Sequence, residues 1–121
     1  MTIPERTRWR LGQRLNLRRR ERWPDLRDLS IRYRADFAYV TGRDQDGPLP
    51  LCRLRYLGSP DNWGFACYLA SKDGYEDSML PSGSFTGTPE EALDCACGLY
   101  LNDPSAWWDA RDNRTDSREN L

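Results

Sequence analysis

The sequence predicts an α+β fold: an N-terminal basic helix, an antiparallel meander of three or four strands, and one C-terminal helix packed on the sheet. Two observations support this fold class. Segments with the composition of strands follow one another from residue 30, and only short turn-rich stretches separate them, which favours antiparallel pairing. A helix-start signal follows the last of these segments, at residues 88–91. A chain of 121 residues suits one domain with its own hydrophobic core.

The first predicted element is a short basic helix over residues 5–22. Leu11 and Leu15 are four residues apart and therefore lie on one side of a helix, although Gly12 lowers the helix propensity. Trp23 precedes a proline and so avoids the α region, which ends the helix at that point.

Charge is divided unevenly along the chain. Residues 1–34 contain eleven arginines and four acidic residues, a net charge of +7, whereas residues 35–121 contain seven cations and fifteen acidic residues, a net charge of −8. An asymmetry of this kind points to an interaction segment. We therefore divide the chain into a basic N-terminal arm or helix (1–29), an α+β domain (30–108) and a disordered polar tail (109–121).

Residues 30–41 alternate in polarity, as a half-buried strand does. The residues expected to share the buried face are Ile31, Tyr33, Ala35, Phe37 and Tyr39. The opposite face would carry Arg32, Arg34 and Asp36. The pattern predicts one continuous strand, followed by a turn at residues 42–48.

Two or three further strands are predicted before the C-terminal helix. The second strand, residues 49–57, has one face formed by Cys52, Leu54 and Tyr56 and another formed by Leu51, Arg53, Arg55 and Leu57. The third, residues 63–70, is apolar on both faces and is therefore expected at the centre of the sheet. A hairpin turn at residues 72–74 leads to a shorter edge strand at residues 75–80.

The C-terminal helix has the clearest local signal. After a loop at residues 81–88, Thr88 occupies the N-cap position, Pro89 the first helical position and Glu91 the third. This arrangement is a capping box, in which the threonine and glutamate side chains bond to each other's backbone N–H groups. The helix is expected to continue to about residue 101.

The absence of histidine excludes several kinds of site. Neither the common mixed zinc sites nor a Ser–His or Cys–His catalytic pair can be built without it. The four cysteines, at positions 52, 67, 95 and 97, lack the paired C-x-x-C spacing of zinc sites. We interpret them as buried apolar side chains in a reducing compartment, with metal or redox chemistry as the alternative, and expect no cofactor.

Membrane and secretory signals are missing from the sequence. No apolar run approaches the ~18 residues that a membrane helix needs. The N-terminus has no apolar stretch after its first charges, as a secretory signal would require. We therefore expect a cytoplasmic protein without a membrane partner.

Arginines provide the candidate binding residues. The helical set comprises Arg14, Arg18, Arg19, Arg20 and Arg22, and the sheet set comprises Arg32, Arg34, Arg53 and Arg55. The helical set is expected to bind nucleic-acid phosphates, to dock on an acidic partner or on the acidic part of its own chain, or to be solvated without a partner. The sheet set forms a cationic patch if its strands pair in register, and otherwise is a solvated face beside acidic neighbours.

Three functions follow from these features. The leading hypothesis is a non-enzymatic binding module that engages nucleic acid through the arginine-rich arm. The alternative is a protein-interaction module, such as an inhibitor, an antitoxin or an accessory subunit, which Trp107, Trp108 and the edge strand favour. The third is a Mg²⁺-dependent enzyme that uses the carboxylate of Asp73, Glu76 or Asp77. The oligomeric state is left open.

Two resemblances accompany these hypotheses. Residues 87–93, Gly-Thr-Pro-Glu-Glu-Ala-Leu, follow an antiparallel meander and are similar to the strand-to-helix junction of HicB-type antitoxins. That resemblance implies a partial RNase H-like α+β fold and a small RNA-cleaving toxin as the partner. More broadly, the segments at residues 63–83 and 87–101 resemble uncharacterised small proteins of high-GC bacteria, which implies no function.

Overall fold

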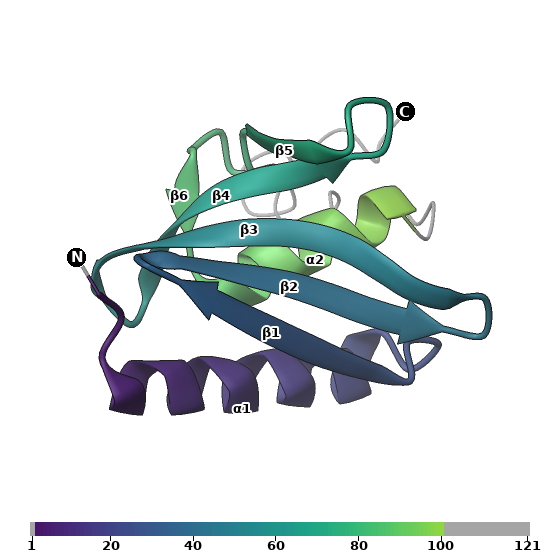
Figure 1. Cartoon of the computed structure of the whole chain (residues 1–121), viewed down its shortest axis with the longest axis horizontal. Helices are drawn as coiled ribbons and strands as arrows, with labels where there is room; N and C mark the ends of the chain where they lie inside the picture. The colour runs from purple at the N-terminus through teal and green to yellow at the C-terminus, as the bar shows by residue number, and fades with distance from the viewer. Residues whose placement is uncertain (1, 101–121) are drawn as a thin grey trace, which may run out of the picture.

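The computed structural model describes residues 2–100, which fold into two layers (Figure 1). In chain order the elements are α1 (Glu5–Arg22), β1 (Asp28–Arg34), β2 (Phe37–Asp44), β3 (Gly47–Ser59), β4 (Asn62–Leu69), β5 (Gly74–Asp77), β6 (Thr86–Gly87) and α2 (Pro89–Tyr100). This is the α+β fold that the sequence predicts, and α1 has the bounds that we expected. The polar tail, Trp107 and Trp108 lie outside the described residues.

Within residues 2–100, six antiparallel strands form one sheet. β1 to β5 are neighbours in chain order, and β6 pairs with β4. The connections within the meander are turns of two to four residues, which explains the antiparallel pairing. β4, which we expected at the centre because it is apolar on both faces, pairs with β3, β5 and β6.

The prediction of one strand over residues 30–41 was wrong, because this segment forms a hairpin. Ala35 and Asp36 make a two-residue turn between β1 and β2, with Ala35 in the left-handed region at a φ of 54°. Glycine, asparagine and aspartate favour such turns, and here only the second position has one of them. The alternation of polarity continues through the turn, so the sequence has no break to mark it.

This turn reverses the predicted faces of β2. Arg34 pairs with Phe37 across the hairpin, and Arg32 pairs with Tyr39. Directly paired residues project from the same face of an antiparallel sheet. Phe37 and Tyr39 therefore share a face with the two arginines, whereas a continuous strand would have placed them opposite.

A second departure from strict alternation occurs at Leu51. Val40 pairs with Cys52 while Thr41 pairs with Pro50, so Leu51 is an extra residue in β3, a bulge. We expected Leu51 on the outer face beside Arg53, but its side chain is fully buried at 0% exposure. A bulge shifts the alternation by one residue, which explains this error.

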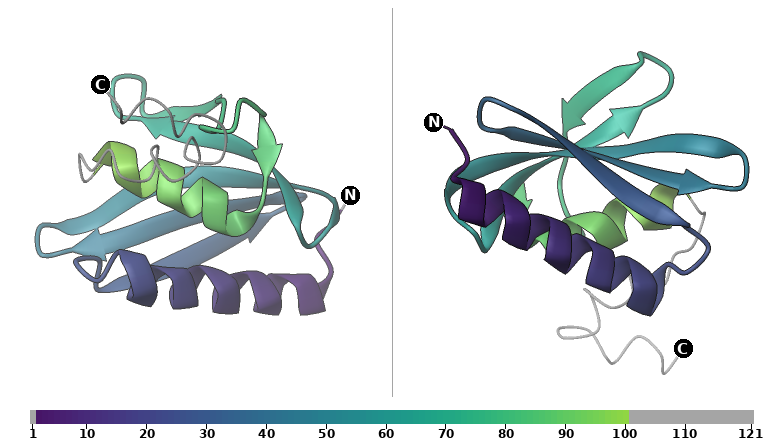
Figure 2. Two further views of the ribbon diagram at one scale, coloured as in Figure 1. Left: turned by 180° about the vertical axis from the view of Figure 1, so that it is seen from behind. Right: turned by 60° about the horizontal axis from the view of Figure 1, so that its bottom comes forward.

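The two helices lie on the same side of the sheet (Figure 2). One hydrophobic cluster joins them to the strands, and its most buried members include Leu11, Leu15, Val40, Leu54, Trp63 and Leu93. The cluster therefore includes side chains from both sides of the boundary that we drew at residue 29. The basic segment and the rest of the chain therefore share one core.

The capping box that begins α2 forms as predicted. The Glu91 backbone N–H donates to the Thr88 hydroxyl at 3.1 Å, and the Thr88 backbone N–H donates to the Glu91 carboxylate at 2.8 Å. These two bonds satisfy N–H groups that a helix start leaves without intrahelical partners.

The four cysteines are free and buried, as we expected. Cys52 and Cys67 are directly paired on β3 and β4. A hydrogen bond with the Cys95 thiol lowers the pKa of Cys67 to about 7, whereas burial raises the pKa of Cys52 and Cys97. Cys95 and Cys97, on α2, belong to the hydrophobic core that joins this helix to the sheet.

Candidate nucleic-acid interface

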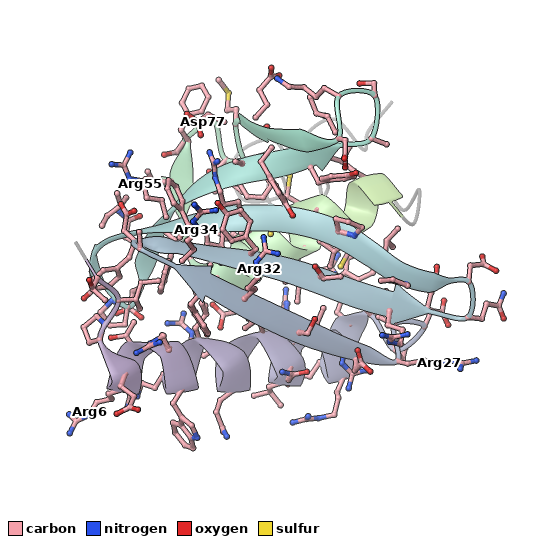
Figure 3. All side chains as sticks on the ribbon, in the orientation of Figure 1. Arg6, Arg27, Arg32, Arg34, Arg55 and Asp77 are labelled. Carbon is pink, nitrogen blue, oxygen red and sulfur yellow. The ribbon has the colours of Figure 1, made fainter. Side chains whose placement is uncertain are left out.

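Among the described residues, no helix covers the second face of the sheet (Figure 1). We call this surface the open face. Its larger side chains are Arg32, Arg34, Phe37, Tyr39, Arg53, Arg55, Tyr68, Tyr75 and Asp77. Figure 3 shows Arg32, Arg34 and Arg55 over the strands, while Arg6 lies at the start of α1. All four sheet arginines predicted from the sequence thus lie on one surface.

Strand pairing arranges the open face in two rows. The first row consists of Arg32, Tyr39 and Arg53, on β1, β2 and β3 respectively. The second row, offset from the first by two residues on each strand, consists of Arg34, Phe37 and Arg55. Each row therefore places an aromatic ring between two guanidinium groups. We expected the arginines to form a patch on neighbouring strands, but an intervening strand with aromatic residues separates them.

The guanidinium groups contact these rings. The Cζ atom of Arg32 lies 4.8 Å from the ring centre of Tyr39, and that of Arg53 lies 4.5 Å from the ring centre of Phe37. The Cζ atom of Arg55 lies 5.8 Å from the same phenylalanine ring. Distances below about 6 Å are typical of cation–π contacts, so the guanidinium groups of Arg32, Arg53 and Arg55 each contact an aromatic ring of β2.

A line of aromatic rings crosses the open face. The ring centres are 6.2 Å apart for Phe37 and Tyr39, 5.3 Å for Tyr39 and Tyr75, and 5.4 Å for Tyr75 and Tyr68. These spacings are typical of edge-to-face aromatic contacts. The line connects β2 to β5 above the two strands between them, so the face presents several ring surfaces to one ligand.

A hollow of about 530 Å³ adjoins the second row. Its lining includes Phe37, Arg53, Arg55, Gly64, Ala66 and Phe85. Gly64 and Ala66 pair with Arg55 and Arg53 on the adjacent strand, so the floor of the hollow has short side chains where its neighbours have long ones. Phe85, in the loop before β6, is 52% exposed.

The open face carries a surplus of positive charge. Arg55 donates to Asp36 at 3.0 Å, and Arg53 contacts Asp77 at 3.5 Å. The hydrogen bond from Arg55 lowers the pKa of Asp36, which stays ionised. Within residues 2–100, Arg32 and Arg34 have no ion-pair partner, so two of the four guanidinium groups are available for an anionic ligand.

The helical arginines occupy a different place. Arg14 donates two hydrogen bonds to Glu90 of α2, from Nε at 2.8 Å and from Nη2 at 2.7 Å, and a third to Asp61 at 2.8 Å. Bidentate pairs of this geometry are among the stronger charged hydrogen bonds. The hydrogen bond to Glu90 raises the pKa of Arg14.

Asp94 is the second anchor for α1. It is only 8% exposed and accepts from Arg18 Nε at 3.1 Å and from the indole N–H of Trp23 at 2.9 Å. Arg22 lies 3.7 Å from the same carboxylate. Arg19 donates to the Leu26 carbonyl, which closes the end of the helix. The arm therefore docks on the acidic part of its own chain, and of the five predicted helical residues only Arg20 is classed as exposed.

The carboxylates considered for a magnesium site are each engaged elsewhere. Asp73 accepts from the Tyr68 hydroxyl, Glu76 pairs with Lys72 at 3.3 Å, and Asp77 pairs with Arg53. No group of three or more Asp, Glu, Cys or His side chains within residues 2–100 could hold a metal ion. The structure does not bring these three carboxylates together as a site.

Sequence reasoning missed the aromatic half of the open face. Phe37 and Tyr39 were expected in the core, because nothing local marks the turn that reverses their face. Phe85 had a usable signal, since a phenylalanine in a loop of Ser, Gly and Thr has no apolar neighbours in sequence to pack against. Tyr75 was placed on an edge strand without a role.

The chain matches no protein-family model, no curated protein and no solved structure. The resemblance to HicB-type antitoxins stays a prediction. In the part of the chain that the structure describes, no helix is long and apolar enough to cross a membrane.

Proposed function

We propose that this protein is a non-enzymatic nucleic-acid-binding module whose contact surface is the open face of the sheet. The observation that supports the proposal is the alternation of arginine and aromatic side chains in two rows across three strands. Guanidinium groups suit phosphates, and aromatic rings stack on bases of any sequence. The two requirements of a nucleic-acid surface are thus met by side chains that already contact each other.

In this proposal α1 has a structural role. Its arginines at positions 14, 18 and 22 pair with acidic residues of the same chain, so they are not available to phosphates. The sheet arginines replace them as the binding residues. A cytoplasmic location is part of the proposal and is supported by the four free thiols, which persist in reducing compartments.

The first prediction concerns Arg32 and Arg34, the two sheet arginines without an ion-pair partner among the described residues. The double variant Arg32→Ala, Arg34→Ala should weaken binding to a single-stranded oligonucleotide by about tenfold at moderate salt. It should also reduce the slope of log K against log salt by about 1.4, since each phosphate contact contributes about 0.7 for a single strand. Fluorescence anisotropy across a salt series measures both.

The matched control is the double variant Arg6→Ala, Arg10→Ala. It removes the same charge from exposed positions on α1, away from the open face. If the wild-type protein shows no binding at low salt, or if the control weakens binding as much as the sheet variant, the proposal is wrong.

The alternative is a protein-interaction module, such as an inhibitor, an antitoxin or an accessory subunit. It is supported by two large apolar side chains on α1, Trp9 at 66% exposure and Leu17 at 51%. Affinity capture from a native lysate separates the two functions. A stoichiometric protein partner that survives nuclease treatment and is lost in Trp9→Ala would favour this alternative.

A further inference from the structure

We propose that the hollow beside Phe37 and Phe85 accepts one unstacked base, so that the open face binds single strands in preference to duplexes. This inference rests on the proposed function and names the form of nucleic acid that the same surface takes. The floor, the walls and the rim of the hollow each support it.

The floor is set by Gly64 and Ala66 of β4. A methyl group on Gly64 would lie 3.3 Å from the Cβ atom of Arg55, so no larger side chain fits there without displacing its neighbour. Glycine inside a strand weakens the strand, and often marks a place where a ligand or another backbone approaches closely. The volume of about 530 Å³ lies within the range of small-molecule sites, roughly 300–1,000 Å³.

The walls are aromatic on two sides. Phe37 carries the guanidinium of Arg53 over its ring at 4.5 Å. Phe85 comes from the loop before β6, and its backbone carbonyl accepts from the Phe65 N–H at 3.0 Å, which ties that loop to β4. Because the loop is anchored, little conformational entropy is lost when a base stacks on this half-exposed ring.

The rim carries positive charge that would bind the phosphate backbone of a single-stranded nucleic acid. Arg53 and Arg55, which pair with Asp77 and Asp36, line the hollow themselves. Arg34, which has no ion-pair partner among the described residues, lies beside Phe37 in the second row. A base that enters the hollow would therefore have guanidinium groups beside the phosphates that flank it. A duplex keeps its bases paired and stacked, so it can use the arginines but not the hollow.

Binding of matched oligonucleotides tests the inference. The wild-type protein, titrated with a single-stranded RNA, a single-stranded DNA of the same sequence and the corresponding duplex, should prefer at least one single strand by tenfold or more. Phe85→Ala should weaken single-strand binding by roughly 5–150-fold, as the loss of one base–aromatic stack does. Duplex binding should be unchanged. The preference between single-stranded RNA and single-stranded DNA shows which of the two the surface binds better.

Gly64→Val provides a second variant, which fills the floor and should weaken single-strand binding to a similar degree. Leu17→Ala is the control, because Leu17 is exposed to nearly the same extent as Phe85 but lies on α1. Thermal unfolding shows whether each variant folds. If Gly64→Val does not fold, the binding of Phe85→Ala tests the inference by itself. If single strands and duplex bind equally and Phe85→Ala has no effect, the inference is wrong while the proposed function stands. Absence of binding to every oligonucleotide would instead overturn the proposed function.

Discussion

The ionisation of Glu90 makes the stability of the contact between α1 and α2 depend on pH. Burial alone would raise the pKa of this carboxyl, but the hydrogen bonds and charge of Arg14 outweigh it, and the pKa is lowered. A carboxyl whose pKa is lower in the folded protein stabilises the fold above its unfolded pKa, about 4.3. That stabilisation is lost as the pH falls through the lower, folded value.

We predict that Glu90→Gln lowers the free energy of unfolding by roughly 1 kcal/mol at pH 7, because a partly buried charged hydrogen bond is lost. The difference from wild type should shrink steadily below about pH 4, where the wild-type carboxyl also becomes protonated. Urea unfolding at pH 7 and pH 3 measures it, with Glu76→Gln as an exposed control. A difference that is as large at pH 3 as at pH 7 would contradict the ionic explanation.

At the scale of elements, the contact between α1 and α2 depends on Asp94. Arg18, Arg22 and Trp23 all direct polar groups to this one carboxylate. The apolar side of α1 is small, with Leu11 and Leu15 as its buried residues. The ion pairs therefore fix the angle and position of a helix whose apolar contacts alone are few.

Asp94→Ala is expected to destabilise the protein by about 3 kcal/mol, since removal of one partner leaves buried polar groups unpaired. Amide protons of α1 should lose protection before those of the sheet, which hydrogen exchange measures. Asp61→Ala is the matched control, because Asp61 is the exposed partner of Arg14 and its loss should cost less than about 1 kcal/mol. Equal effects of the two substitutions would show that Asp94 does not anchor the helix.

At the scale of the whole molecule, the two faces of the sheet have opposite roles. One face is buried under both helices, and the four cysteines lie in the core between it and α2, two on the sheet and two on the helix. The other displays arginine and aromatic side chains that have no helix to cover them among the described residues. A sheet with one buried and one solvated face is common in antiparallel folds, and here the solvated face holds the candidate site.

The thiols report on the integrity of that core. In the native protein, Ellman's reagent should modify far fewer than the four cysteines of the chain within minutes, because all four are buried. In urea all four should react, with a midpoint equal to that of unfolding followed by circular dichroism. Rapid reaction of one thiol under native conditions would show local opening between α2 and the sheet.

The sequence by itself determined the fold class, the bounds of α1 and the start of α2. These depend on residues close together in the chain: the spacing of Leu11 and Leu15, the proline after Trp23, and the capping box at Thr88. Such signals act through local backbone geometry, which the sequence displays directly.

Only the tertiary structure decided the character of the open face and the role of the basic arm. The turn at Ala35–Asp36 reverses the faces of Phe37 and Tyr39, and the local pattern does not mark it because polarity alternates through the turn. Arg14, Arg18 and Arg22 of α1 find acidic partners on α2, more than seventy residues away for Arg14 and Glu90. Partners so distant in sequence are brought together only by the packing of both helices on one side of the sheet.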